Sequence, residues 1–145
     1  MSQEDHRRIE LTRLSKGHYV ATNGRGGKLE FSSGLGEPAF SPVELFLTAI
    51  AGCSGADVDF ITSKRAEPTG FTVTVDGDKV RDENGNHLTG LRLTFDLAFP
   101  NDEGGDAARE VLPSAVAKSQ DRLCTVSRTI VMGTPIEVRI VSTDE

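Results

Sequence analysis

Ser41-Pro-Val-Glu44, followed by Leu45-Phe-Leu-Thr-Ala-Ile-Ala-Gly-Cys53, is the stretch that most constrains the fold of this chain. A serine at the N-cap, a proline at the first helical position and a glutamate at the third form a capping box with an N1 proline. The run that follows is apolar on every face, and such a helix belongs in a core. We therefore expect a buried central helix that begins at Ser41 and runs to about Arg65.

Shorter patterns on both sides of this helix complete the fold prediction. Alternating and β-branched runs predict strands, and Gly-rich or Asn-rich stretches between them predict hairpin turns, one of which is Asn23-Gly-Arg-Gly-Gly27 and another Asn84-Gly-Asn86. A second helix is expected from Asp106 to about Leu123, where Pro113 either kinks the helix or marks a later start. The expected strands are 9–14, 18–22, 28–31, 71–75, 91–99 and a closing strand, Ile136–Val141.

This order of elements predicts a single α+β domain over residues 1–145, with helices on one face of a mostly antiparallel sheet. The chain has 145 residues and a formal net charge of -6. No basic face is expected, so nucleic acid and anionic membrane surfaces are poor partners. We find no apolar run near the roughly 20 residues that span a bilayer and no signal peptide, and expect a cytoplasmic protein without a membrane partner.

The two cysteines of the chain, Cys53 and Cys124, are far apart in sequence, and both are expected inside helices. They are either two inert core residues or one dithiol that acts as a unit. In the cytoplasm a disulfide between them would be catalytic or transient rather than structural. The isolated histidines give no metal-ligand spacing with these cysteines, so no metal is expected.

A reactive thiol also needs a cation that favours its thiolate. Arg25, in the turn Gly24-Arg25-Gly26, is the first candidate because arginine keeps its charge when it is partly buried. The alternative is that Arg25 is a solvated turn residue.

Three segments together resemble the OsmC/Ohr family of osmotically induced and organic-hydroperoxide-resistance proteins. They are Ala21-Thr-Asn-Gly-Arg25, the helix start Ser41-Pro-Val-Glu-Leu-Phe46 with its continuation to Ala51-Gly-Cys53, and Leu123-Cys-Thr-Val-Ser127. The resemblance covers nearly the whole chain. It implies mostly antiparallel curved sheets, a buried central helix, a second long helix, and an intertwined homodimer with sites formed between subunits.

The resemblance also implies a thiol-dependent peroxidase without a cofactor. In the family, the central-helix cysteine attacks an organic hydroperoxide and becomes a sulfenic acid, and the later cysteine closes a disulfide. A dithiol reductant such as a lipoylated protein then opens that disulfide. These roles map to Cys53 and Cys124, and the role of the thiolate-stabilising arginine maps to Arg25.

Two positions set this chain apart from the peroxidase branches of the family. At these positions the chain resembles a less well-defined branch. Val43 stands where those branches have a glutamate that steadies the arginine, and the glutamate follows one residue later as Glu44. Glu44 is read first as the capping-box residue and second as the partner of Arg25. Asp57, one helical turn after Cys53, would disfavour the Cys53 thiolate unless Arg25 or Arg128 neutralises it. The alternative is that Asp57 has only a structural role, as a cap or in a pair.

Two hypotheses follow. The first is a peroxidase that acts on organic hydroperoxides through Cys53, Cys124 and Arg25. The second is a non-enzymatic stress-response protein that binds a small apolar ligand at the dimer interface and has inert cysteines.

Overall fold

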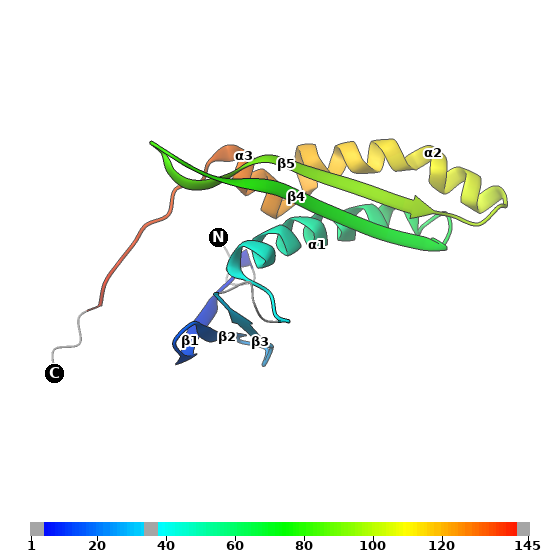
Figure 1. Ribbon diagram of the computed structural model, residues 1–145. Coiled ribbons are helices and arrows are strands. Elements are labelled where there is room, and N and C mark those ends of the chain that lie inside the picture. The colour runs from blue at the N-terminus through cyan, green and yellow to red at the C-terminus, as the bar shows by residue number, and fades with distance from the viewer. Residues whose placement is uncertain (1–4, 34–37, 142–145) are drawn as a thin grey trace. The chain divides into compact units, whose positions relative to one another are not determined.

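The computed structural model describes residues 5–33 and 38–141, and the chain divides into two compact units, Met1–Thr48 and Ala49–Glu145 (Figure 1). The described part is a mixed α+β fold with antiparallel sheets, as predicted. In the first unit, β1 (Ile9–Ser15), β2 (His18–Asn23) and β3 (Lys28–Ser32) form an antiparallel sheet in the order β1-β2-β3. The three N-terminal strands are confirmed to within a residue or two.

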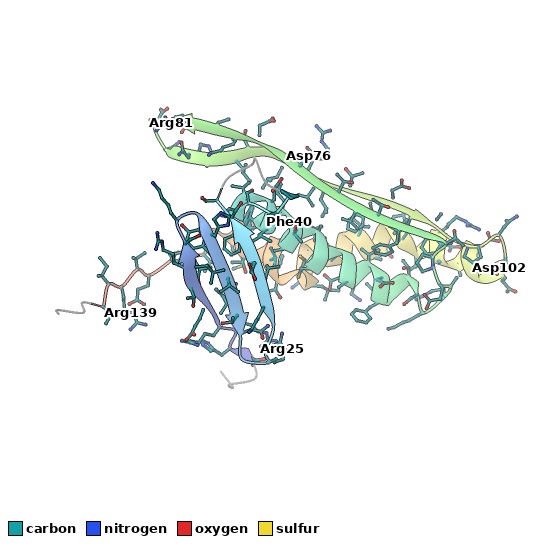
Figure 2. All side chains as sticks on the ribbon, turned by 60° about the horizontal axis from the view of Figure 1, so that its bottom comes forward. Arg25, Phe40, Asp76, Arg81, Asp102 and Arg139 are labelled. Carbon is teal, nitrogen blue, oxygen red and sulfur yellow. The ribbon has the colours of Figure 1, made fainter. Side chains whose placement is uncertain are left out.

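The turn between β2 and β3 is the predicted hairpin turn around Arg25. The Asn23 side-chain oxygen accepts hydrogen bonds from the backbone N–H of Arg25 at 3.0 Å and of Gly27 at 2.9 Å. Gly26 has a φ of +91°, a conformation that residues with a side chain rarely adopt. The turn presents Arg25 at one end of the sheet, with its side chain exposed (Figure 2).

Helix α1 (Pro42–Thr62) begins with the predicted capping box. The Ser41 N–H donates to Glu44 Oε1 at 2.9 Å, and the Glu44 N–H donates to Ser41 Oγ at 3.2 Å. These reciprocal bonds satisfy two backbone N–H groups that have no partner within the helix. The capping role of Glu44 is therefore confirmed, and the helix ends three residues before the expected Arg65.

Loss of this cap gives a first testable prediction. Ser41→Ala is expected to lower the free energy of unfolding by about 1 kcal/mol, because the Glu44 N–H loses its acceptor. Glu44→Gln is the matched control, since glutamine also serves in a capping box, and it should cost less than Ser41→Ala. Urea unfolding followed by circular dichroism measures both, and equal losses would argue against the capping box.

The second unit is built on a long hairpin. Strands β4 (Gly70–Asp82) and β5 (Gly85–Ala98) pair antiparallel from Gly70 opposite Ala98 to Asp82 opposite Gly85. Helix α2 (Glu103–Lys118) runs along this hairpin in Figure 1. It continues into a π-helical turn, η2 (Ser119–Leu123), and α3 (Thr125–Met132) follows directly.

The second helical region differs from its prediction in two ways. Helix α2 begins at Glu103, where the Asp102 side chain caps it by accepting from the Gly105 N–H at 2.7 Å, and Pro113 lies inside the helix. A later start at Pro113 is therefore wrong. Cys124 lies outside both helices, as the N-cap of α3, because the chain leaves helical geometry there at φ -74° and ψ 102°.

Helix α1 is buried along one face only within a single chain. Ile50, Ser54, Gly55, Val58 and Thr62 are buried, and Gly55 lies against Val73 and Phe71 of β4. On other faces apolar side chains stay exposed, to 38% for Phe46 and 73% for Phe60. In the isolated chain, α1 is thus buried on one face and not on all faces.

Contrary to the expectation of no bilayer-length apolar run, the 21-residue helix α1 contains an 18-residue window with a mean hydropathy of 1.4 and has the length and composition of a membrane span. This is weak evidence for a membrane, because the core helix of a soluble protein meets the same criterion.

The predicted closing strand, Ile136–Val141, is not a strand in this structure. Figure 1 shows the chain after α3 leaving the hairpin as an extended segment. Its apolar side chains are exposed, at 87% for Ile136, 80% for Val138 and 92% for Ile140. The prediction of a closing strand is wrong for this structure. The residues alternate, but a strand needs a neighbouring edge to pair with, and this segment pairs with none of the strands described.

Candidate functional site

The two cysteines meet in the second unit, where α1 faces the start of α3. Cys53 is half-buried on α1, whereas Cys124 is 0% exposed and both thiols are free. Each cysteine affects the pKa of the other, because Cys124 raises the pKa of Cys53 whereas Cys53 lowers that of Cys124. Residues 70 positions apart are thereby brought into one cluster, since Ser54, the neighbour of Cys53, contacts Cys124 directly.

Hydrogen-bonding groups surround the Cys124 sulfur. The Ser127 N–H donates to it at 3.4 Å, as expected for an N-cap side chain, and Ser54 Oγ lies 3.2 Å away. Ser127 Oγ lies at 3.3 Å, where it accepts from the thiol and can turn to donate once the sulfur is ionised. This arrangement is well suited to hold a thiolate.

These surroundings move the two pKa values in opposite directions. Burial raises the pKa of the Cys53 thiol, and the hydrogen bond and charge of Cys124 raise it further, against the opposing amides of Val126 and Thr125. Burial also acts to raise the pKa of Cys124, but hydrogen bonds from Ser127, Ser54 and Cys53 outweigh it and lower that pKa. These surroundings favour the thiolate of Cys124 over that of Cys53.

A chain of polar side chains connects this cluster to Asp57. Gln120 Nε2 donates to Ser54 Oγ at 3.0 Å and to Ser119 Oγ at 3.3 Å. Ser119 in turn donates to Asp57 Oδ2 at 2.9 Å. Of the alternatives for Asp57, the structural hydrogen bond is the one observed.

An open, mostly apolar cavity of about 220 Å³ adjoins the thiol cluster. Gln120 and Ser127 belong to both, so the cavity lies next to the groups that contact Ser54 and Cys124. Arg92 of β5 is also among the lining residues. The other lining residues are Ile50, Val75, Leu91, Leu93, Ile130 and Val131.

The remaining predicted site residues, Arg25 and Glu44, belong to the first unit. Arg25 is exposed in the β2–β3 turn, and Glu44 is held by its capping bond to Ser41. The structure brings Cys53 and Cys124 together, whereas a catalytic role for Arg25 or Glu44 stays a prediction.

No metal centre is found in the described part of the chain. Within residues 5–33 and 38–141, no three His, Cys, Asp or Glu side chains are grouped so that they could hold a metal ion. His87 instead lies 3.7 Å from Asp82 at the end of the β4–β5 hairpin.

Sequence reasoning missed Ser54, Gln120, Ser127 and Arg92. One signal was available, because Cys124-Thr-Val-Ser127 ahead of Gly133 has the spacing of a short helix with an N-cap and a glycine C-cap. Nothing in the sequence indicated the π-helical turn that brings Gln120 to Ser54.

Comparison with known proteins identifies the family. An uncharacterized protein of Mycobacterium tuberculosis is 28% identical over 133 residues, which cover 90% of this chain and 93% of that protein. An OsmC-like protein of unknown function from Vibrio cholerae has a similar structure, with a TM-score of 0.70 and 14% identity over 86% of this chain and 93% of the other.

An organic hydroperoxide resistance protein OsmC from Legionella pneumophila has a TM-score of 0.57 and 19% identity, over 86% of this chain and 88% of the other. At these identities the structures establish the fold. The model of the OsmC-like protein family matches residues 34–139, which is most of the chain. The chain therefore belongs to the OsmC-like protein family.

Proposed function

We propose that this protein is a thiol-dependent peroxidase that reduces organic hydroperoxides through a sulfenic acid on Cys53 and a disulfide between Cys53 and Cys124. The observation that carries the proposal is the cluster of two free thiols beside an apolar cavity. Family membership supports it, as does the similarity to the Legionella protein named for organic hydroperoxide resistance.

The exposure of the two sulfurs supports the order of events. Cys53 is half-buried and Cys124 is fully buried, so an entering peroxide reaches Cys53 first. The Cys53 sulfur attacks the terminal peroxide oxygen, the O–O bond breaks, and the alcohol leaves with the thiol proton. The Cys124 thiolate then attacks the sulfenic sulfur and releases hydroxide, which solvent protonates, and the S–S bond closes.

Cys53 needs activation for the first step, because burial raises its pKa. We propose Arg25 for this role, as the resemblance to the OsmC/Ohr family implies, because its side chain is exposed and arginine keeps its charge. Glu44 is assigned to the helix cap, because its carboxylate already accepts from the Ser41 N–H.

The apolar cavity is proposed to bind the organic part of the peroxide. Hydrophobic walls with a few polar groups are typical of small-molecule sites. An aromatic hydroperoxide such as cumene hydroperoxide is a suitable probe, and hydrogen peroxide is the probe without an apolar part.

A charge placed at this cavity tests its role. Val131→Asp is expected to raise the KM for cumene hydroperoxide about tenfold, because the carboxylate disfavours an apolar ligand, with little change for hydrogen peroxide. Val131 is 72% exposed, so the fold should tolerate the change.

Met132→Asp is the matched control. Met132 is the next residue, is 71% exposed, and is not among the residues that line the cavity. Equal KM values for the two variants would show that the cavity is not the substrate site.

The protein is further proposed to act as a homodimer. Exposed apolar side chains on α1 and on residues 136–141 leave surface that a second copy would cover. The alternating segment Ile136–Val141 would add a strand to a sheet of the partner. A two-stranded sheet such as β4–β5 is also marginal without further packing.

The direct test of the proposed function is turnover. With dihydrolipoamide as the dithiol reductant, the protein should consume cumene hydroperoxide catalytically. We propose the cytoplasm as its location, because that compartment keeps dithiol reductants reduced. Reversible binding of cumyl alcohol or another apolar probe in the cavity, with no peroxide consumed, would support the non-enzymatic ligand-binding alternative instead.

A further inference from the structure

The hydroxyl group of Ser54 lies between Gln120 and Cys124. Gln120 Nε2 donates to Ser54 Oγ at 3.0 Å, so this oxygen is an acceptor on that side. The Ser54 hydrogen is then free to point to its other neighbours, Cys124 Sγ at 3.2 Å and Ser127 Oγ at 3.5 Å. The closer contact, to a sulfur atom that is larger than oxygen, favours donation to Cys124.

The π-helical turn η2 holds Gln120 in position for this contact. Ser119, the first residue of the turn, is fully buried and donates to Asp57 of α1. The Cys124 N–H closes the turn on the Ser119 carbonyl at 2.7 Å. Gln120 and Cys124 are therefore fixed to the same anchor and meet Ser54 together, and π-helical turns of this kind often occur at functional sites.

We propose that Gln120 is a positioning residue that directs the Ser54 hydroxyl toward Cys124 and keeps the Cys124 sulfur as the thiolate of the pair. As a consequence, a reductant opens the disulfide by attacking Cys53. This inference deepens the proposed function and rests on its dithiol cycle. Among the contacts described, Gln120 has none with either reacting sulfur. It acts through Ser54, which contacts Cys124.

The reduction step follows from the geometry. One thiolate of the reductant attacks Cys53 Sγ, a bond forms between these two sulfurs, and the Cys53–Cys124 bond breaks with its electron pair on Cys124. The second thiol of the reductant then displaces Cys53, which leaves as a thiol, and the reductant ends as a disulfide. Attack at Cys53 is favoured because Cys124 is fully buried and because a stabilised thiolate is the better leaving group.

The effect of Gln120 on the Cys124 sulfur is measured by the ultraviolet absorbance of the thiolate. In the Cys53→Ser background Cys124 is the only thiol, so a pH titration reports on it alone. Adding Gln120→Leu is expected to raise the titration midpoint by about one unit, because Ser54 loses the donor that orients it. Asp121→Asn, at an exposed residue of the same turn, is the control and should shift the midpoint much less.

A double variant tests whether Gln120 acts through Ser54. Ser54→Ala should raise the midpoint by at least as much as Gln120→Leu, and the two changes together should raise it no further than Ser54→Ala alone. Additive shifts, or a midpoint that Gln120→Leu leaves unchanged, would overturn the positioning role. Circular dichroism of each variant confirms that the fold is retained.

The site of attack is mapped on protein oxidised with diamide, which closes the disulfide without any peroxidase activity. A monothiol, 2-mercaptoethanol, is added, free thiols are blocked with N-ethylmaleimide, and peptides are analysed by mass spectrometry. The mercaptoethanol adduct is expected on Cys53 and the maleimide on Cys124. The opposite pattern would overturn the proposal even if the protein proves to be a peroxidase, and the expected pattern would stand even if it does not.

Discussion

Cys53→Ser is expected to abolish the consumption of organic hydroperoxide, with kcat falling by more than about a thousandfold. Serine has nearly the shape of cysteine, but its hydroxyl is not ionised at neutral pH and does not attack the peroxide oxygen. The measurement is the steady-state consumption of cumene hydroperoxide in the presence of dihydrolipoamide. Cys53 is half-buried on α1, so the substitution should leave the fold intact.

Cys124→Ser is the informative partner of this variant. It retains the attacking sulfur and loses the one that closes the disulfide, so one equivalent of peroxide should be consumed rapidly and turnover should then stop. The product should be a sulfenic acid on Cys53 that excess peroxide converts to sulfinic acid. If Cys53→Ser and Cys124→Ser exchange these behaviours, the assignment of the two sulfurs is reversed.

Charges on the apolar face of the C-terminal segment are expected to have the second large effect. Val138→Asp combined with Ile140→Asp should convert the proposed dimer to a monomer at micromolar concentration, because two carboxylates would be buried when the segment pairs with a partner. Both residues are at least 80% exposed in the single chain, so the monomer itself should not be destabilised. Sedimentation velocity measures the change in mass.

The alternation of this segment supplies a matched control. Arg139 lies between the two substituted residues, and in an extended chain successive side chains point to opposite sides. Arg139→Ser changes the charge of the segment without placing a charge on its apolar face, and this variant should remain dimeric. A wild-type protein that sediments as a monomer, or a charged variant that stays dimeric, would refute the role of this segment.

Local signals predicted most of the fold. The capping box around Ser41 located the start of α1, and the Asn-Gly turn at Asn23 located the first hairpin, because each depends on hydrogen bonds within a few residues. The alternation of Ile136–Val141 predicts a strand, but whether the segment pairs depends on an edge elsewhere, and it pairs with none of the described strands. Helix α3 was missed because its N-cap, Cys124, is an unusual capping residue.

The site was predictable only in part. The resemblance to a known family implies a pair of Cys53 and Cys124, which their spacing in the sequence does not require, and the structure places both residues in one cluster. The surroundings of the pair were not predictable, because Gln120 and Ser127 reach the cluster through a π-helical turn and a short helix. Those surroundings lower the pKa of Cys124.

Intact mass after exposure to one equivalent of cumene hydroperoxide tests the central claim most directly. The wild-type chain should lose two hydrogens and no free thiol should remain, and digestion should yield a peptide pair joined through Cys53 and Cys124. A mass that does not change, with both thiols still reactive toward maleimide, would contradict the account.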